Sequence, residues 1–295
     1  MKRKLHSFQI RRNRAFEIGW HRNGGEYRSI FDNKHYLSAI LRGWNIPVPD
    51  DLAILNHNGA HWLTGRSEQS RDWPDWLADV DDGKYFIKPA NGNHGRNAGM
   101  LTKSRGLIKF NGTEVDPAKA RQTLLAEPGD FLLQRWIEQH PDMGIHSNAT
   151  VNTIRALTVR LSPDQVILFH AVMRNGRTDR FLDNFHAGGI AVQVDVDSGE
   201  TIGEGVQLRP RANLKRHPDS NRPLSGNPVP RFMNVKEILI RAHGMFPGLK
   251  SVGWDVAVSL NGPIIVEGNL DWDVEIHAFC DPNFRQSLSR LLRGN

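Results

Sequence analysis

The chain has 295 residues, enough for one large domain or for two lobes with a real core. Its formal net charge of +6 favours anionic ligands such as phosphates, nucleotides, acidic sugars or nucleic acid. The single cysteine, Cys280, excludes an intramolecular disulfide and a cysteine-based zinc site. No segment approaches the ~20 apolar residues of a membrane span, and no apolar stretch follows the basic residues after Met1, so we expect a soluble, cytoplasmic protein.

Residues 29–49 predict a helix that follows a basic, polar segment and ends at Gly43. Asp32 or Asn33 serves as its N-cap, and Lys34 falls in the first turn, where anions are usually preferred. This lysine is either solvated or positioned to face a nucleotide. The predicted apolar stripe of the helix comprises Tyr36, Leu37, Ile40 and Leu41.

A short strand over residues 85–87 ends at Lys88 and leads into a glycine-rich loop over residues 91–99. Glycines allow backbone N–H groups to approach phosphate oxygens closely, and flanking cations add positive charge. The pattern is neither a P-loop nor a Rossmann fingerprint, and a plain turn is the alternative interpretation. The first residues of this loop are Asn91, Gly92, Asn93, His94 and Gly95.

Residues 106–110 predict a strand, and residues 117–125 predict a helix after a turn at Asn111-Gly112. The chain from Phe131 then begins as a strand and continues into a connector. Such a connector can hydrogen-bond an adenine edge through its backbone while an apolar side chain packs on the ring. An interior strand with a packed tryptophan explains the pattern equally well. The connector residues are Gln134, Arg135, Trp136 and Ile137.

Residues 148–161 and 166–175 predict two buried strands, each of which carries an arginine. Arg155 lies on the first strand and Arg174 on the second. A guanidinium group cannot be neutralised, so an arginine on a central strand needs an anion. That anion is either a core carboxylate or a bound phosphate, and we favour the phosphate.

Residues 181–194 hold polar side chains between apolar ones, followed by Gly188-Gly189 and a strand. The glycine pair allows close backbone approach, and the polar residues are either turn formers or substrate contacts. Residues 195–230 then predict an irregular, basic loop, of a length that is usually functional or mobile. Helices are predicted over residues 232–246 and 283–293. The polar residues concerned are Asp183, Asn184 and His186.

Residues 252–273 carry the strongest functional signal, because two apolar runs joined by Asn261-Gly262 predict a β-hairpin. A tight hairpin brings Asp255 and Glu267 side by side, and strand alternation points Glu267 and Asn269 to one face. Two carboxylates and an amide oxygen form a hard-oxygen site suited to Mg²⁺ bound to a polyphosphate. A surface hairpin with incidental acids is the alternative, but the apolar runs indicate buried strands, where an unpartnered carboxylate is costly. The predicted strands span residues 253–260 and 263–267.

Taken together, these segments resemble the ATP-grasp superfamily, and more narrowly the sugar-transfer-associated ATP-grasp family. The resemblance covers roughly residues 30–275, and it rests on the combination of phrases more than on any one of them. The phrases are DNK at 32–34, IKPANGNHG, QRWIEQHP, VNTIRALTV, LDNFHAGGI, HPDS, GWDVAV and VEGNLDWD. The chain departs from the family at large in having only a short basic segment before Asp32, and in a loop that carries asparagine, histidine and arginine where smaller residues are common.

The resemblance implies an α+β protein with the ATP-grasp fold, in which two α+β lobes clamp MgATP between antiparallel sheets. We expect residues 1–83 to form an N-terminal segment and helical part. Residues 84–140 would form the small lobe with the glycine-rich loop, and residues 141–295 the large lobe with the metal site.

The resemblance also implies roles for individual residues. Lys88 contacts the α- and β-phosphates, Lys34 lies near the nucleotide, and the segment 134–137 lines the adenine pocket. Arg155 faces the γ-phosphate or an acyl phosphate, so it and Lys88 are the expected catalytic groups. Asp255, Glu267 and Asn269 hold Mg²⁺, with two ions expected. The expected substrate contacts are Arg174, Asp183, Asn184, His186, Gly188, Gly189 and His217.

The implied reaction is phosphorylation of a carboxylate by ATP, followed by attack of an amine or similar nucleophile on the acyl phosphate. The carboxylate would come from a small molecule, a peptide or a saccharide precursor. The alternatives are a kinase that phosphorylates a hydroxyl group and a protein that binds ATP without turnover. Nucleic acid is an unlikely partner because the sequence contains no groove-reading motif.

Overall fold

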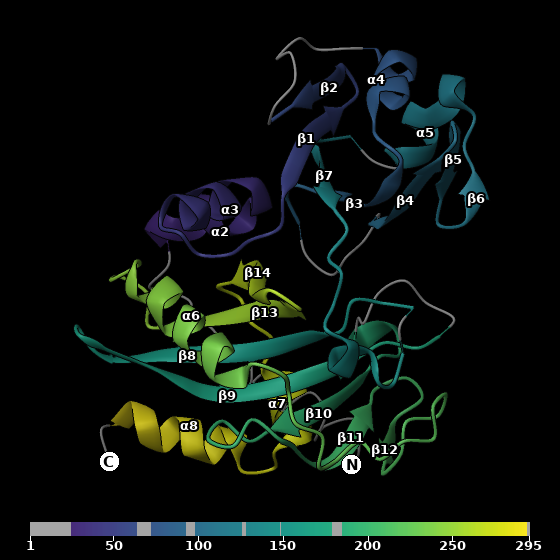
Figure 1. The fold of residues 1–295 in the computed structure, drawn as a ribbon. Coiled ribbons are helices and arrows are strands. Elements are labelled where there is room, and N and C mark those ends of the chain that lie inside the picture. Colours follow the sequence, from purple (N-terminus) through teal and green to yellow (C-terminus); the bar gives the residue numbers. More distant parts are fainter. Residues whose placement is uncertain are drawn as a thin grey trace, which may run out of the picture. The chain divides into compact units, whose positions relative to one another are not determined.

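The computed structural model describes residues 25–63, 72–92, 98–125, 128–147, 149–178 and 185–293. The chain divides into two compact units, and each is described by itself. The small unit is Asp32–Glu138, and the large unit combines Met1–Phe31 with Gln139–Asn295. Each unit is built around a seven-stranded sheet of antiparallel strand pairs with helices beside it, so the predicted α+β class is confirmed (Figure 1).

The sheet of the small unit has the strand order β2-β1-β7-β3-β4-β5-β6. The predicted small lobe begins at residue 84, but two of these strands, β1 and β2, lie before that residue. They belong to the sheet because β1 pairs with β7. The strands are β1 (Asp51–Asn56), β2 (Gly59–Trp62), β3 (Gly83–Pro89), β4 (Gly99–Ser104), β5 (Leu107–Phe110), β6 (Thr113–Glu114) and β7 (Phe131–Arg135).

One face of this sheet carries the apolar core of the small unit. Ile87 of β3 and Leu133 of β7 point into a cluster that also contains Trp76 and Leu124. Trp76 lies on a helix that begins at Trp73-Pro74, where proline is well suited because it lacks the N–H group that a helix start leaves unpaired. The helices are α3 (Lys34–Gly43), α4 (Trp73–Asp79), the 3₁₀-helix η2 (Pro117–Lys119) and α5 (Ala120–Leu124).

The sheet of the large unit has the order β12-β11-β10-β9-β8-β13-β14, and the hairpin β13–β14 forms one edge. The strands are β8 (Thr153–Ser162), β9 (Gln165–Asn175), β10 (Ile190–Val194), β11 (Thr201–Gln207), β12 (Ala212–Leu214), β13 (Ser251–Ser259) and β14 (Gly262–Asn269). The helices are α2 (Arg28–Asp32, whose last residue is counted with the small unit), α6 (Phe232–Gly244), α7 (Val274–Cys280) and α8 (Phe284–Arg293), with 3₁₀-helices η1 (Gly25–Tyr27), η3 (Pro141–Gly144) and η4 (Phe185–Ala187).

Helices cover both faces of the large sheet (Figure 1). On one face, Leu157 of β8 packs in a cluster with residues of α7 and α8, among them Val274 and Phe284. On the other face, Thr158 accepts the indole N–H of Trp254 at 2.8 Å and contacts His243 of α6 at 2.8 Å. Adjacent strand residues therefore serve opposite faces, as strand alternation requires.

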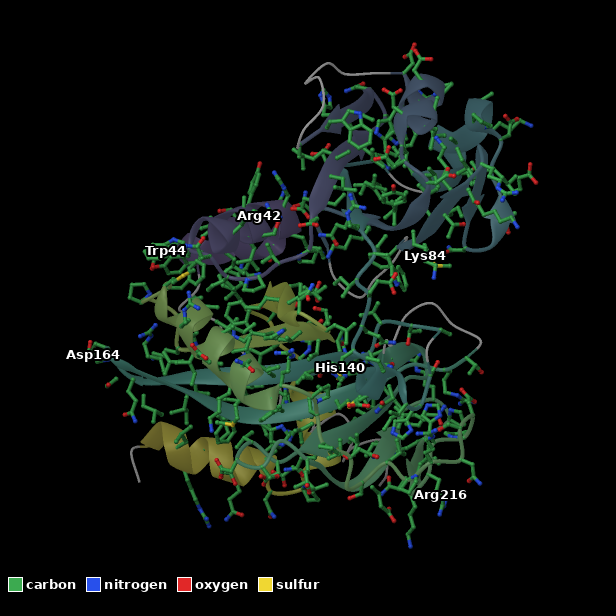
Figure 2. All side chains as sticks on the ribbon, viewed as in Figure 1. Arg42, Trp44, Lys84, His140, Asp164 and Arg216 are labelled. Atoms are coloured by element: carbon green, nitrogen blue, oxygen red, sulfur yellow. The ribbon has the colours of Figure 1, made fainter. Side chains whose placement is uncertain are left out.

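Several sequence predictions need correction. The interval 195–230 is not wholly irregular, since it contains β11 and β12; β11 was missed because its sequence TIGEGVQ lacks apolar alternation. Helix α7 was also missed. In α3, Leu37 and Leu41 are buried, but Tyr36 is 56% exposed and does not belong to the buried stripe. Trp44 directly after α3 is likewise exposed (Figure 2). Within the residues that the structure describes, no helix has the length and apolar character of a membrane span.

Candidate functional site

The small unit aligns a lysine and a glutamine on one face of its sheet. Gln134 of β7 lies opposite Phe86 of β3, and Lys88 lies opposite Leu132. Residues that face each other across an antiparallel pair share a face, and so do residues two apart on a strand. Phe86, Lys88 and Gln134 therefore share the face opposite the apolar core. Lys88 and Gln134 are 5% and 3% exposed, so both polar groups are buried.

A buried aspartate organises this face. Asp51 of β1 lies directly opposite Gln134, whose Nε2 donates to Asp51 Oδ1 at 2.6 Å. Its other oxygen accepts from Ser38 Oγ at 2.5 Å and lies 3.1 Å from His35 Nδ1, both from α3. Burial alone raises the pKa of Asp51, but the hydrogen bonds from His35, Gln134 and Ser38, with the charge of Lys88, bring it below its ordinary value. Asp51 is therefore a carboxylate at neutral pH.

The start of α3 is fixed to the start of the glycine-rich loop. Asn33 caps the helix, as predicted, by accepting from the backbone N–H groups of His35 and Tyr36. Lys34 donates its backbone N–H to Ala90 O at 2.9 Å and its ammonium group to Gly92 O at 2.5 Å. Lys34 is thus held at the loop that follows Lys88. Asn91 also lies at this junction, bridged to Asn33 and exposed.

The last residue of β7 and the connector that follows it present one polar and two apolar side chains. Arg135 is exposed and lies 4.0 Å from Asp50. Trp136 and Ile137 are half-buried, and the Trp136 ring makes an edge contact with Phe86 at 6.4 Å between centroids. Five predicted site residues, by contrast, lie outside the described residues and receive no structural account: Asn93, His94, Gly95, Asp183 and Asn184.

In the large unit, the hairpin β13–β14 places Asp255 directly opposite Glu267, as the sequence predicted. The turn was predicted wrongly: Ser259 pairs with Gly262, so Leu260 and Asn261 form it, and Gly262 follows with a φ of +131°. A register shift between Asp255 and Val256 then supplies an extra residue on β14. Because a one-residue slip turns side chains to the opposite face, this bulge is what sets Glu267 beside Asp255.

Asp255, Glu267 and Asn269 share one face of the hairpin. Asn269 Nδ2 donates to Glu267 Oε1 at 3.3 Å, and Glu267 lies directly opposite Asp255. Asn269 lies opposite Gly253, which is in phase with Asp255. The three oxygen-bearing side chains therefore converge, as predicted.

Two arginines from the neighbouring strands contact the same carboxylate. Arg155 of β8 lies opposite Asp255, with its Nε 2.6 Å from Oδ1 and its Nη2 donating to Oδ2 at 3.1 Å. Arg174 of β9 reaches Oδ2 with its Nη2 at 3.1 Å. The sequence allowed two anionic partners for these arginines, a core carboxylate or a bound phosphate. The structure provides the carboxylate, Asp255, and a phosphate contact stays a prediction.

The cluster sets two carboxylates, Asp255 and Glu267, against two guanidinium groups, Arg155 and Arg174, so its formal charges balance. Burial raises the pKa of Asp255 to about 6, against the two arginines, which lower it, and with a further rise from Glu267. The nearby imidazoles do not change this balance. Burial holds the pKa of His170 at about 4 and that of His277 well below its ordinary value, so both are neutral.

The donor set Asp255, Glu267 and Asn269 fits a hard divalent cation. It offers two carboxylates and an amide oxygen, the ligand types that Mg²⁺ prefers. The repulsion between the two carboxylates is what a cation would relieve. Among the described residues, no group of three or more His, Cys, Asp or Glu side chains could hold a metal, so this mixed set is the candidate there.

The remaining predicted substrate contacts lie in two places. His186 of η4 lies 3.5 Å from Asp273, the residue that caps α7, while Gly188 has a φ of +100° and Gly189 is buried beside it. His217 is part of a separate polar group: its Nε2 lies 3.1 Å from Gly176 O, and its ring stacks on that of His146.

Asp51 is a buried member of the small-sheet face that carries Lys88, and the sequence patterns did not predict it. Its partners come from α3 and from β7, which is 83 residues further along the chain, so no local spacing reveals the group. The only signal was an acidic residue at the start of the apolar run DLAIL.

Comparison with solved structures identifies the fold. The biotin carboxylase domain of the Hydrogenobacter thermophilus 2-oxoglutarate carboxylase, crystallised with MgADP, ADP and bicarbonate, matches with a TM-score of 0.50 at 12% identity over 92% of this chain and 47% of that chain. The Campylobacter jejuni biotin carboxylase, in a β-γ-ATP complex, also has a TM-score of 0.50 at 12% identity, over 90% and 47% of the two chains. This chain thus spans about half the length of either structure, and the likeness shows the ATP-grasp fold.

Comparison of sequences identifies the family. A sequence model described as sugar-transfer associated ATP-grasp matches residues 12–289, nearly the whole chain, and the protein belongs to this family. The search of curated protein sequences found no match.

Proposed function

We propose that this protein is an ATP-dependent ligase that converts a carboxylate to an acyl phosphate and then joins it to an amine or similar nucleophile. The observation that carries the proposal is the convergence of Asp255, Glu267 and Asn269 with Arg155 and Arg174 on one face of the large sheet. Acids suited to a cation, set against guanidinium groups, are what phosphoryl transfer from ATP requires.

In the small unit, the nucleotide-binding groups would be those on and beside the face that carries Lys88. The Lys88 ammonium would contact the α- and β-phosphates, and Lys34 would add a second positive charge at the loop, where it is held by Ala90 and Gly92. The half-buried Trp136 and Ile137 would pack on the base. A Gly-rich segment at 91–99 would supply backbone N–H groups to the phosphates.

In the large unit, Asp255, Glu267 and Asn269 would hold Mg²⁺, with two ions proposed. The cation would neutralise charge on the phosphate oxygens. Arg155 and Arg174 already lie 2.6 Å and 3.1 Å from Asp255, so both guanidinium groups would lie near the metal-bound phosphate. Arg155 would stabilise the negative charge that develops on the transferred phosphoryl group.

The reaction would proceed in two balanced steps. A carboxylate oxygen of the substrate attacks the γ-phosphorus of ATP, the bond to the bridging oxygen breaks, and ADP leaves. The nucleophile then attacks the acyl carbon, a proton leaves the nucleophile, and inorganic phosphate departs. The carboxylate would belong to a small molecule, a peptide or a saccharide precursor, and Arg174, His186 and His217 would contribute to its binding.

Product analysis tests this proposal. The purified protein is incubated with MgATP and a panel of carboxylic acids, with and without amines, and ADP release is measured. We expect ADP formation that requires an acid and rises with an amine. Release of AMP would contradict the acyl-phosphate route, and a stable phosphorylated product formed from an alcohol alone would assign a kinase instead.

A further inference from the structure

The face of the small sheet that carries Lys88 contains a charged residue to which no nucleotide contact is assigned. Asp51 is 3% exposed, and one of its oxygens receives the Gln134 side chain at 2.6 Å. The other oxygen is engaged by Ser38 and His35 of α3. The carboxylate is therefore enclosed by side chains that contact it, and each of its two oxygens already has a partner.

This arrangement fixes which way the Gln134 amide points. An ionised carboxylate only accepts hydrogen bonds, so the amide group of Gln134 must turn its NH₂ end toward Asp51. The positions of the nitrogen and oxygen of the Gln134 amide are therefore assigned from the charge of Asp51, because the reversed amide would place two acceptors against each other. The carbonyl oxygen Oε1 is consequently directed away from Asp51, as the acceptor end of the side chain.

The surroundings of Gln134 suit a purine base. Phe86 lies opposite it on β3 and makes an edge contact with Trp136, so aromatic rings flank a polar amide. Apolar walls with a single positioned amide are typical of sites for a flat heterocycle. Lys88, two residues beyond Phe86 on the same face, supplies the positive charge for phosphates.

We propose that Asp51 is a positioning residue that sets base specificity: by holding the NH₂ end of Gln134, it presents Oε1 as an acceptor and selects a 6-aminopurine nucleotide over a 6-oxopurine nucleotide. The 6-amino group of adenine donates to such an oxygen, whereas the 6-oxo group of hypoxanthine or guanine is itself an acceptor and is repelled. This inference rests on the proposed binding of a nucleotide by the small unit.

Binding measurements on the full chain test the inference directly. Dissociation constants for MgATP and MgITP are measured by calorimetry, because the two nucleotides differ at the 6-position and at the adjacent ring nitrogen. We expect the wild-type protein to bind ATP about 10- to 100-fold more tightly than ITP. Asp51→Asn should bring the two affinities within about threefold of each other, since an asparagine can donate or accept and lets the Gln134 amide turn.

Two further variants separate positioning from general stability. Ser38→Ala removes a different donor to Asp51 and leaves the Gln134 contact in place, so it should keep the wild-type ATP:ITP ratio. In a Gln134→Met background, which lacks the amide, Asp51→Asn should leave the ratio unchanged, because its effect acts through Gln134. Thermal melting of each variant reports on folding.

Specific results would overturn the inference. Equal binding of ATP and ITP by the wild-type protein would do so without any variant, and this outcome would leave the ligase proposal standing. An unchanged ATP:ITP affinity ratio in folded Asp51→Asn would also contradict the inference. So would a change in that ratio that is equally large with and without Gln134. If Asp51→Asn does not fold, the comparison of wild type with Gln134→Met decides, and an unchanged ratio there refutes the inference. Absence of any nucleotide binding would refute both the inference and the ligase proposal.

Discussion

Two buried aspartates, one in each unit, show how differently a folded chain can treat the same side chain. Asp51 and Asp255 are 3% and 4% exposed, and each lies on a strand of a seven-stranded sheet. The pKa of Asp51 is lowered despite burial, because Ser38, His35 and Gln134 hydrogen-bond to it and Lys88 lies nearby. Burial raises the pKa of Asp255 to about 6, even though two arginines contact it, and Glu267 adds to the rise.

The difference shows that the Asp51 group is satisfied by the protein alone, whereas the Asp255 group is not. The Asp51 group satisfies its carboxylate with donors from the protein itself, so breaking that group removes stabilising contacts. The Asp255 group places a second carboxylate against the first and so retains repulsion that a cation would relieve. Stability sacrificed in this way is common where a site is built for a ligand. The variants below should therefore have opposite effects on stability in the two units.

The largest expected effect comes from Glu267→Gln, which removes one carboxylate from the Asp255 group. We expect Mg²⁺-dependent ATP turnover to fall by at least about 100-fold, since a metal ligand is lost. The metal-free protein should be unchanged or up to about 1 kcal/mol more stable, because like-charge repulsion is relieved. Turnover is measured by ADP release, and stability by urea denaturation.

The matched control for Glu267→Gln is Glu237→Gln, at an exposed position of α6. This variant should change neither the ATP turnover nor the free energy of unfolding. Full turnover by Glu267→Gln would remove Glu267 from the metal site, and a large loss of metal-free stability would contradict the contrast with Asp51.

The next largest effect is expected from Lys88→Ala in the small unit. Loss of the buried ammonium group should weaken MgATP binding by about tenfold or more, since charge-assisted contacts to phosphate are lost. Lys84→Ala is the control, because Lys84 lies four residues earlier on the same strand and the same face but is exposed (Figure 2). Calorimetry of both variants decides, and equal affinities for Lys84→Ala and Lys88→Ala would exclude a specific role for Lys88.

How far the sequence predicted these two groups depends on where their members lie in the chain. Asp255 and Glu267 belong to one hairpin, so their pairing followed from local patterning alone, although the turn and the bulge that set the register did not. The sequence indicated that the arginines of β8 and β9 need an anion. Only the strand order, which the structure supplies, shows that Asp255 is such an anion. Asp51 could not be found, because its donors come from α3 and β7.

The fold was likewise predictable only in part, where local patterns in the sequence are strong. The family phrases indicated the ATP-grasp fold, and strongly patterned elements such as α6 and β8–β9 appear as expected. Strands β11 and β12 were missed because glycine and polar residues interrupt their pattern. The pairing of β11 with β10 and of β12 with β11 overrides that local signal. Tyr36 fits the helical period of α3 but is exposed, since the period alone does not say how wide the buried face is.

A moderate effect on stability is expected from Ser38→Ala. The variant removes the 2.5 Å hydrogen bond to Asp51 and leaves the carboxylate with one donor fewer. We expect a loss of about 1–2 kcal/mol in the free energy of unfolding, the range for a buried hydrogen bond to a charged group. Ser104→Ala, at an exposed strand end of the same unit, should cost less than about 0.5 kcal/mol. A gain in stability from Ser38→Ala would contradict the view that this group is complete.

The smallest effect is a change in acid stability, and it tests the charge on Asp51 directly. Because the folded protein lowers the pKa of this carboxyl below its ordinary value of 3.8, ionised Asp51 adds stability above that value, and this stability is lost as the pH falls through the folded pKa. Asp51→Asn cannot titrate, so its unfolding free energy should fall less steeply with decreasing pH in this acid range. The difference in slope cannot exceed about 1.4 kcal/mol per pH unit, the value for one proton. Urea denaturation of both proteins from pH 5 downward measures the slopes, and parallel curves would show that the pKa of Asp51 is the same in the folded and unfolded chains.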